Sequence, residues 1–434
     1  MWRLKFYFFS QLFCLAAILI LGRPLGAWTH SQRDEGPRNQ GELSGTASTV
    51  EASRPVFIFG QDAILLLTRE LQRYRALAAA GGWPEIPAGM LLKRGIRHGD
   101  VPVLRRRLAV AEAAPGDRND SDLFDEELER AGMDFQARHG LQTDGVVGPL
   151  TRMALNVPPG ERVNQILVNL ERLSWISENL GERYIYVNIA AFTLDVIEHR
   201  KKTLSMKVVV GKPYWNTPVF SAPMTYLIIN PSWNIPESII AEEILPRLQE
   251  TPDYLAKQNI RVLSGGRENP TEVDPATVNW RHMITPLEYR FRQEPGPLNP
   301  MGRIKFMFPN RYNVYLHDTP AKDLFKKWVR AFSHGCIRIE KPLELAQYLL
   351  QDSPPSIRAK AEKALVSGEL TVVDLARPIK VHIVYLTAWP DDTGRVQFRG
   401  DIYGRDASLL ETLRQKALVS GSEVPTGTHV TLSQ

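Results

Sequence analysis

Hydrophobic positions recur first with helical spacing and later with strand spacing along the chain. Over 56–80 the apolar residues follow a helical period, which stops at Gly81, Gly82 and Pro84. A second amphipathic helix is predicted over 161–180, before Gly181. From Tyr184 short runs rich in Val, Ile, Tyr and Phe alternate with turn-forming or charged residues. The pattern therefore predicts an α+β protein with a helical first part and a β-rich second part.

The β-rich part contains runs of strand length separated by turn signals. Strands are predicted at 184–190, 192–198, 206–212, 224–229, 304–308, 313–316, 379–389 and 395–399. The last two are expected to pair across the turn at 390–394. Between 236 and 300 helical and proline-rich segments interrupt this pattern. Because loops of this length are generally functional, we expect an insertion that caps a site.

Residues 90–157 form a small unit of their own. Phe124, Leu128, Ala131 and Phe135 lie on one face of a predicted helix, between a helix through 103–108 and one that begins at Pro149. Three short helices with tight glycine turns are more typical of a binding module than of a catalytic scaffold.

Two features of this module invite a ligand interpretation. His98 and His139 have no Cys or carboxylate at ligand spacing, so surface positions are expected rather than a metal site. The basic residues are expected to form a solvated face, with a site for an anionic polymer as the alternative. They are Lys93, Arg94, Arg97 and Arg105 to Arg107.

The N-terminus has the pattern of an export signal. Arg3 and Lys5 precede a mostly apolar run over 6–22, and small residues follow up to Ala27. We expect either a signal peptide over 1–27 or, if it is not cut, an inner-membrane anchor through 6–22. The rest of the chain is then exported, to the periplasm or cell envelope. The polar stretch 28–54 predicts a disordered tether.

Composition and charge narrow the function classes. The chain has 434 residues, of which 43% are hydrophobic and 23% charged, proportions typical of globular domains. Its net charge is +5, and Arg3, Lys5 and Arg23 supply three of these charges, so +2 remains beyond residue 27. Nucleic-acid binders usually carry a pronounced basic face, so no nucleic-acid partner is expected.

Cysteine usage directs attention to one residue. Cys14 lies in the apolar run, so Cys336 is the only thiol expected in the exported chain and has no disulfide partner. A catalytic thiol needs a base or cation in reach, and the chain offers His317 and His334. Gly335 permits an unusual backbone angle and leaves room for substrate. Arg338 points to the same side as Cys336 if the segment is extended, where it can bind a carboxylate.

Other interpretations of Cys336 remain open at this point. It can be a buried structural residue. Zinc binding with His334 and His317 is disfavoured, because the spacing is unusual and no further Cys is present. A papain-like site would place the cysteine before its histidine, the reverse of the order here, although order alone is not decisive.

The segments "LHDTP" and "SHGCIR" together resemble the signature of YkuD-type L,D-transpeptidases. The flanks "NPSWNIPESI", "NPMGRIKFMFPN" and "DIYGRD" are similar to large multidomain members of that family. Likewise "FQARHGLQTDGVVGPLTRMALN" resembles the small helical peptidoglycan-binding domain of wall enzymes. The resemblance covers nearly all of 55–406. It departs at Asp318, where some relatives place Gly or Ser, and at Arg338, where others have Asn.

The resemblance implies a fold, a reaction and a set of site residues. Cys336 is the expected nucleophile and His317 the general base, and His334 is the third expected catalytic residue, which shapes the loop and polarises or orients the reacting groups. Tyr315, Ser333, Gly335 and Arg338 are expected to contact substrate. The reaction is a 3→3 crosslink between peptidoglycan stems through a thioester, with release of D-Ala and no metal or organic cofactor. L,D-carboxypeptidase or lipoprotein-amidase activity at the same site is the alternative, and a non-catalytic wall-binding protein is a further one.

The residue patterns and the family resemblance together predict how the chain is organised. The fold is a β-rich L,D-transpeptidase catalytic domain with a capping insertion, plus a three-helix peptidoglycan-binding module and a helical scaffold. Partners are expected to be stem peptides and glycan, with a glycosyltransferase or carboxypeptidase supplying the donor. The expected segments are 1–27 signal or anchor, 28–54 tether, 55–89 scaffold, 90–157 module, 158–183 scaffold helix, 184–406 catalytic domain with insertion 236–300, and 407–434 C-terminal extension.

Overall fold

The structure is a computed structural model that describes residues 59–112, 120–176, 180–251, 253–266, 269–280 and 288–420. The predicted signal or anchor over 1–27 and the tether over 28–54 lie outside these residues. So does 421–434, the end of the predicted C-terminal extension. None of the described helices combines the length and apolar character that a membrane span requires.

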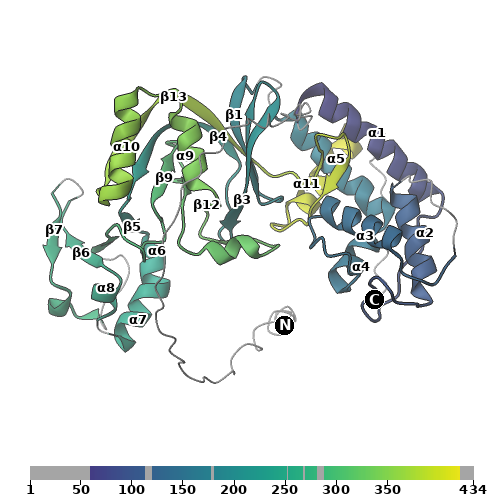
Figure 1. Cartoon of the computed structure of the whole chain (residues 1–434), viewed down its shortest axis with the longest axis horizontal. Coiled ribbons are helices and arrows are strands. Elements are labelled where there is room, and N and C mark those ends of the chain that lie inside the picture. Colours follow the sequence, from purple (N-terminus) through teal and green to yellow (C-terminus); the bar gives the residue numbers. More distant parts are fainter. Residues whose placement is uncertain are drawn as a thin grey trace, which may run out of the picture. The chain divides into compact units, whose positions relative to one another are not determined.

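Two helices distant in sequence pack together as a scaffold (Figure 1). They are α1 (Gly60–Ala79) and α5 (Pro159–Ser174), so the second ends earlier than the predicted 180. The buried stripe of α1, which includes Leu67 and Leu71, shares a hydrophobic cluster with Ile166 of α5. The hairpin of β14 (Ala388–Pro390) and β15 (Val396–Phe398) completes this cluster. The scaffold is thus attached directly to the C-terminal part of the chain.

The module contains the three predicted helices, α2 (Asp100–Glu112), α3 (Glu126–Arg138) and α4 (Pro149–Leu155). The Asp125 side chain accepts a hydrogen bond from Leu128 N and so caps α3. One expectation is wrong: His139 is buried, because its ring stacks on Phe135 at a centroid distance of 3.8 Å and faces Phe398 at 5.5 Å. This histidine fills the contact between the module and the β15 strand.

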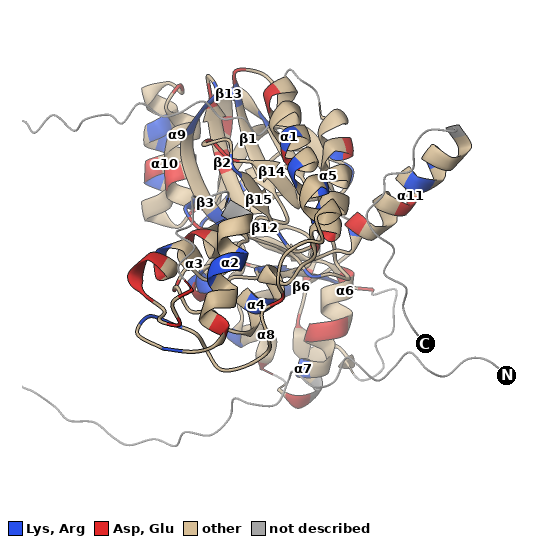
Figure 2. Ribbon diagram, turned by 90° about the vertical axis from the view of Figure 1, so that its right-hand side faces the viewer, with Lys and Arg blue, Asp and Glu red and all other residues tan. Residues whose placement is uncertain are grey.

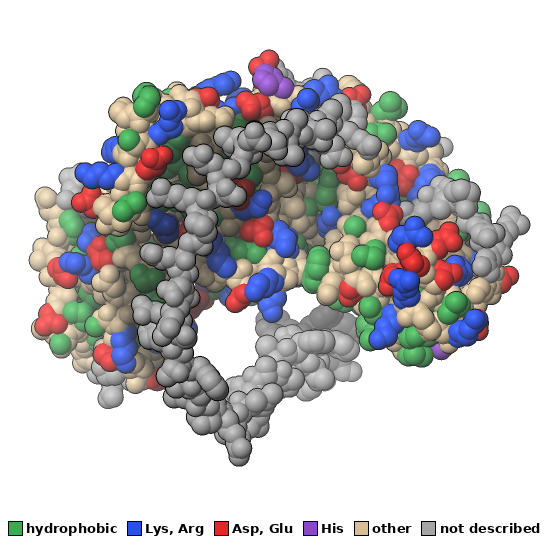
Figure 3. All heavy atoms as spheres, viewed as in Figure 1, with side chains coloured by type: hydrophobic (Ala, Val, Ile, Leu, Met, Phe, Trp, Pro, Cys, Tyr) green, Lys and Arg blue, Asp and Glu red, His purple; other side chains and the backbone are tan. Residues whose placement is uncertain are grey.

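Most of the basic cluster of the module is paired with acid. Arg94 lies 2.9 Å from Glu126 and Arg106 lies 2.8 Å from Asp120, and Arg97 and Arg105 pair with Asp122 and Asp125. Arg107 is buried and lies over the Trp83 ring. The module accordingly shows blue and red side chains next to one another in Figure 3. These contacts favour the solvated face over a site for an anionic polymer.

One large sheet forms the centre of the β-rich part of the chain. Its strand order is β11-β3-β12-β10-β9-β4-β13-β1-β2, and an additional pairing of β2 with β3 closes it into a barrel-like form. The strands are β1 (Arg183–Asn188), β2 (Thr193–Glu198), β3 (Lys201–Gly211), β4 (Phe220–Ile229), β9 (Ile304–Met307), β10 (Leu316–His317), β11 (Ala331–Ser333), β12 (Ile337–Ile339) and β13 (Thr371–Val384). Their inward apolar residues make the largest core.

Three strands begin earlier than predicted, since β3, β4 and β13 start at residues 201, 220 and 371 rather than 206, 224 and 379. Two predicted runs differ further from the structure. The run 313–316 forms strand only at Leu316–His317, since Asn313 has a positive φ of 53°. The run 379–389 divides into β13 and β14, because backbone N–H groups between them hydrogen-bond to side chains instead of to a neighbouring strand. Leu386 N and Thr387 N donate to the amide oxygens of Asn188 and Asn169. These bonds satisfy backbone groups that a continuous ladder would otherwise use.

The segment predicted as an insertion has its own sheet and core. Its sheet order is β5-β8-β6-β7, and a separate hydrophobic cluster lies against it. The elements are β5 (Trp233–Ile235), α6 (Glu237–Ile239), the π-helical turn η1 (Ile240–Ile244), α7 (Leu245–Glu250), α8 (Tyr254–Lys257), β6 (Ile260–Ser264), β7 (Thr271–Val273), the 3₁₀ turn η2 (Pro275–Thr277) and β8 (Arg290–Gln293).

The remaining elements pack against the large sheet or, in the case of α11, against α5. They are the 3₁₀ turn η4 (Lys322–Lys326), α9 (Pro342–Leu350), α10 (Pro355–Ser367) and α11 (Arg405–Ser420). Helix α9 and helix α10 both contact β13, whereas α11 contacts α5. In Figure 2 most of α11 extends away from the other elements, and charged residues of both signs are interspersed along most helices.

Candidate active site

The predicted nucleophile lies in the short loop between β11 and β12. The side chains of Ile337 and Ile339 enter the barrel core, so alternation directs Cys336 and Arg338 to the opposite side. Both line a cavity of about 290 Å³. Strand β10 pairs in parallel with β12 and places His317 opposite Arg338. Local alternation and strand register together converge these side chains on one cavity.

Six of the seven predicted site residues line this cavity: Tyr315, His317, Ser333, His334, Cys336 and Arg338. The seventh, Gly335, forms the backbone of the loop. The wall opposite the loop comes from the segment 236–300, through residues that include Ile239, Glu243 and Tyr254. The insertion therefore lies directly against the candidate nucleophile.

Close backbone packing holds the Cys336 loop in place. Gly335 has a φ of 112°, which side-chain-bearing residues rarely adopt. A Cβ on Gly211, at the end of β3, would lie 1.9 Å from Trp215 O and 3.1 Å from Gly335 Cα. The Ser333 hydroxyl donates to Cys336 O and accepts from Gly335 N. The loop therefore has little freedom to move.

Thr217 connects this loop to β3 through hydrogen bonds. Its buried hydroxyl donates to Gly335 O at 2.9 Å and accepts from Gly211 N at 2.9 Å. The Tyr403 hydroxyl in turn donates to Gly211 O at 2.7 Å and accepts from Thr217 N at 3.2 Å. Two hydroxyl groups thus satisfy four backbone groups next to the nucleophile.

Two opposing effects act on the pKa of the Cys336 thiol. Burial raises the pKa of this thiol, while a hydrogen bond from Tyr315 and the charges of Lys305 and Arg338 oppose the rise. Lys305 Nζ lies 3.6 Å from the centre of the Tyr315 ring. Sγ itself is 3.9 Å from Asn313 O. Burial dominates, so the resting group is a thiol rather than a thiolate.

His317 is buried and held by a backbone carbonyl. Its Nδ1 lies 2.5 Å from Asp318 O, which makes Nδ1 the protonated nitrogen and leaves Nε2 as the basic one. Burial, and next the charge of Arg338, lower the pKa of His317 to about 3. The imidazole is therefore neutral at neutral pH. Neither imidazole of the site is hydrogen-bonded to the thiol within the part of the chain that the structure describes.

The Asp318 side chain has a structural role next to this histidine. One carboxylate oxygen accepts from Arg303 N at 2.8 Å, and the other accepts from Lys322 Nζ at 2.6 Å. Only the backbone carbonyl of Asp318 contacts the imidazole. The contact that orients the histidine therefore does not depend on the side chain at position 318.

His334 connects the loop with the insertion. Its ring lies 3.7 Å from the Trp215 ring centre, and its Nε2 lies 3.1 Å from Glu243 Oε1 in η1. Burial lowers the pKa of His334, an effect that Glu243 opposes. Because Glu243 belongs to the insertion, this contact ties the insertion to the residue two positions before Cys336.

Four site residues escape an analysis of the sequence alone: Lys305, Trp215, Thr217 and Glu243. Lys305 was detectable in principle, since it is a lone cation within the apolar strand run at 304–308. Thr217 and Glu243 carry no such signal, because their segments meet the loop only through the fold.

Replacing Lys305 by methionine is expected to raise the pKa of the Cys336 thiol. The ammonium group stabilises the thiolate, so its loss moves the pH profile of alkylation by iodoacetamide upward by about one unit. Mass spectrometry of the Cys336 peptide measures the rate at each pH. The variant Lys207→Met, at an exposed position on β3, is the matched control and should leave the profile unchanged. An identical profile in both variants would exclude Lys305 from the environment of the thiol.

Family comparisons agree with the arrangement of the chain. Residues 182–368 match the YkuD family, the L,D-transpeptidase catalytic domain, and residues 97–155 match the family described as "Putative peptidoglycan binding domain". A curated protein of Haemophilus influenzae, described as "Putative L,D-transpeptidase", is 31% identical over 245 residues. That alignment covers 56% of this chain and 48% of the relative, so the chain aligns with about half the length of that protein.

Solved L,D-transpeptidase structures give more distant matches. The structure from Xylanimonas cellulosilytica is 14% identical, covers 69% of this chain and 100% of its own, and has a TM-score of 0.20. The structure from Stackebrandtia nassauensis is 14% identical, with coverages of 69% and 96% and a TM-score of 0.25. The chain thus carries a YkuD-type L,D-transpeptidase catalytic domain over residues 182–368, preceded by a peptidoglycan-binding domain over residues 97–155.

Proposed function

We propose that this chain forms 3→3 crosslinks in peptidoglycan through a thioester on Cys336. The observation that supports this best is the composition of the 290 Å³ cavity, where a thiol, a neutral imidazole and a guanidinium share one wall. A thiol attacks a carbonyl, an imidazole moves the proton, and a guanidinium binds a carboxylate. These are the groups that acyl transfer from a carboxylate-terminated peptide requires.

In the first half-reaction, Cys336 Sγ attacks the carbonyl of the third residue of a donor tetrapeptide stem. His317 Nε2 takes the thiol proton and then gives it to the departing amine of D-Ala, while the C–N bond breaks. A thioester between Sγ and the stem remains. In the second half-reaction, an amine of a neighbouring stem attacks this thioester, loses its proton to His317 and forms the new amide. The thiol is regenerated, and no cofactor is needed.

Arg338 is proposed to bind the terminal carboxylate of the donor. Its buried Nε has no hydrogen-bond partner among the described residues, and burial lowers the pKa of this guanidinium. A substrate carboxylate would accept a hydrogen bond from this Nε and would also favour the charged form of the guanidinium. It would also cancel the charge that, after burial, contributes most to the low pKa of His317. Donor binding would therefore raise the basicity of His317 at the moment when a base is needed.

The insertion over 236–300 is proposed to cap the site during transfer. Glu243 of the insertion contacts His334, and Ile239, Glu243 and Tyr254 line the same cavity as Cys336. Exclusion of water favours attack by an amine over hydrolysis of the thioester. Ser333, Gly335, His334 and Tyr315 are proposed to shape this loop and contact the stem, with the backbone N–H groups of the loop stabilising the oxyanion.

The segment 90–157 is proposed to bring the enzyme to peptidoglycan by contacting glycan and stem peptides. Action in the cell envelope requires export, which the N-terminal signal would provide. A carboxypeptidase that trims stems to tetrapeptides, or a glycosyltransferase that supplies the glycan carrying them, is the proposed source of the donor.

Mass spectrometry tests the proposal. The chain lacking residues 1–27 is incubated with a disaccharide-tetrapeptide, and both the protein and the products are analysed. We expect a Cys336 acyl adduct, free D-Ala and a crosslinked dimer. An adduct that yields only tripeptide would establish L,D-carboxypeptidase activity instead, and no adduct would contradict the acyl-enzyme mechanism.

Replacing Thr217 by valine is expected to slow this reaction by about 10- to 100-fold. The change leaves Gly211 N and Gly335 O without their partner and lets the loop shift, and small displacements of a nucleophile are costly. The effect should fall on kcat more than on KM, because the residue does not contact substrate. Thr217→Ser retains the hydroxyl and should restore most of the rate. Equal losses in the valine and serine variants would show that the hydroxyl is not the reason.

A further inference from the structure

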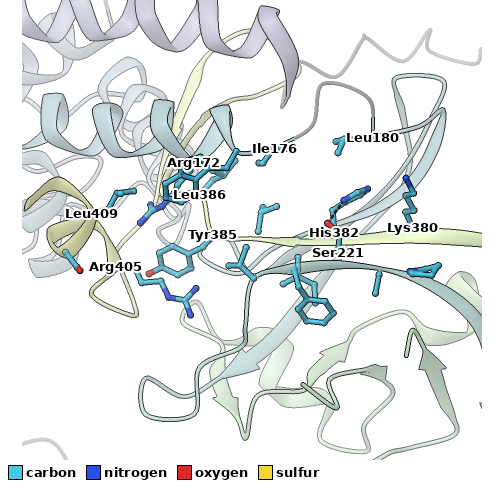
Figure 4. Close-up of a pocket in the computed structure, with 18 of the residues that line it drawn as sticks. Arg172, Ile176, Leu180, Ser221, Lys380, His382, Tyr385, Leu386, Arg405 and Leu409 are labelled. Atoms are coloured by element: carbon cyan, nitrogen blue, oxygen red, sulfur yellow. Dashed lines mark hydrogen bonds between the residues drawn. The ribbon is translucent and has the colours of Figure 1, made fainter. Parts of the chain in front are cut away.

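A second cavity, larger than that of the nucleophile, lies away from Cys336. It has a volume of about 940 Å³ and shares no lining residue with the cavity of the nucleophile. Its floor is formed by β4 and β13, and its walls by the end of α5 and the first turns of α11 (Figure 4). Nothing in the proposed reaction uses this space.

Apolar side chains from four segments line the middle of the cavity. They include Ile176, Leu180, Phe220, Ile383, Leu386 and Leu409. From α11, Arg405, Ser408, Leu409 and Thr412 face the cavity, a spacing that places them on one side of the helix. Cavities of several hundred Å³ with mostly apolar walls and few polar groups are the usual form of small-molecule sites.

The charged side chains that line the cavity are of one sign. They are Arg172, Lys380 and Arg405, and no acidic residue lines it among the described residues. Burial lowers the pKa of His382, which also lines it. Arg172 is neutralised by Asp406 at 2.6 Å. Arg405 lies about equally over the Tyr385 and Tyr403 rings, at 5.0 Å from each centre, and donates to Thr217 O at 3.4 Å.

Lys380 remains available to a ligand. It is exposed on β13 and has no ion-pair partner in the described part of the chain. Figure 4 shows it beside His382 and Ser221, at the side of the cavity remote from Arg405 and Leu409. The His382 Nδ1 and Ser221 Oγ atoms are 2.7 Å apart, so this polar pair lies next to the lysine. An acidic group at this position would meet an ammonium group, with apolar walls directly behind it.

We propose that this cavity binds a single-chain amphipathic anion, with its acidic head at Lys380 and its aliphatic chain between β13 and α11. The head is held by the charge of Lys380, and the chain is driven into the cavity by burial of apolar surface. A cation with the same chain would meet the ammonium of Lys380 and the guanidinium of Arg405 and no acidic lining residue, so it should be rejected. The site is independent of the proposed crosslinking reaction.

Calorimetric titration of the full chain with decanoate, kept below its micelle concentration, tests the proposal. We expect saturable binding that decyltrimethylammonium does not reproduce. Ser408→Trp places a ring into the cavity from the exposed surface of α11 and should weaken binding by about tenfold or more. Ala407→Trp, on the adjacent exposed position that does not line the cavity, is the matched control and should bind normally. Lys380→Met should weaken binding by about threefold to fivefold.

Three outcomes would overturn the site. Equal binding by both tryptophan variants would place the decanoate elsewhere, including on the N-terminal apolar segment. Equal affinity for decyltrimethylammonium would remove the role of charge. Binding to phosphatidylglycerol vesicles, without binding to phosphatidylcholine vesicles or to free decanoate, would show that the region meets an anionic lipid surface rather than a single chain in a cavity.

Discussion

Replacing Cys336 by alanine is expected to abolish crosslinking, with a fall in turnover of about 10⁴-fold or more. Cys336 is the single cysteine after Cys14, so no other thiol of the chain lacking residues 1–27 can form the thioester. Arg338 and the loop backbone would still bind substrate, but no thiol would remain to accept the acyl group. Product formation measured by liquid chromatography with mass spectrometry should reach the background, and the adduct on the Cys336 peptide should disappear.

The control for this variant is retention of the other properties of the chain. The loop is held by the Thr217 and Ser333 hydrogen bonds, none of which involves the thiol. Cys336→Ala should therefore keep the thermal midpoint and should still sediment with isolated peptidoglycan. Full turnover in the variant would contradict the mechanism, and loss of sedimentation would show that the change has disturbed more than the nucleophile.

Replacing His317 by asparagine is expected to reduce turnover by about 10²- to 10⁴-fold, the usual contribution of a general base. The asparagine amide can still donate to Asp318 O, as Nδ1 does, but it cannot accept the thiol proton. The loss should appear in the acylation step, which single-turnover measurement of the Cys336 adduct isolates. His334→Asn, at the other imidazole of the cavity, is the comparison and should be affected less.

The pH profile provides a second measurement of the same assignment. Since the pKa of His317 is about 3 in the substrate-free enzyme, protonation of this base should not reduce kcat/KM between about pH 5 and pH 7. If binding of the donor carboxylate at Arg338 raises the pKa of His317, the acid limb of the kcat profile should lie at a higher pH than that of the kcat/KM profile. A larger loss in His334→Asn than in His317→Asn would reverse the assignment of the two histidines.

Much of the candidate site could be predicted because it is local in sequence. Residues 333–338 carry the nucleophile, its loop glycine and the carboxylate-binding candidate, and the alternation of a strand is sufficient to direct Cys336 and Arg338 to one side. The helices α1 and α5 were also predictable, because each buries one apolar stripe with a clear helical period. The division of 379–389 was not, since the break depends on Asn169 and Asn188 from other elements.

The sequence by itself determined which residues could perform chemistry in this protein, because reactivity belongs to side-chain type and short-range alternation belongs to the backbone. It determined that Cys336 is the single cysteine after Cys14, that His317 and His334 lie near it in sequence, and that a helical part precedes a β-rich part. Only the tertiary structure decided which groups tune that thiol. Lys305 reaches it from β9, Thr217 supports its loop from the segment after β3, and Glu243 meets His334 from the insertion. The physical reason is that strand register and burial set distances and pKa values, and both arise from contacts between segments far apart in the chain.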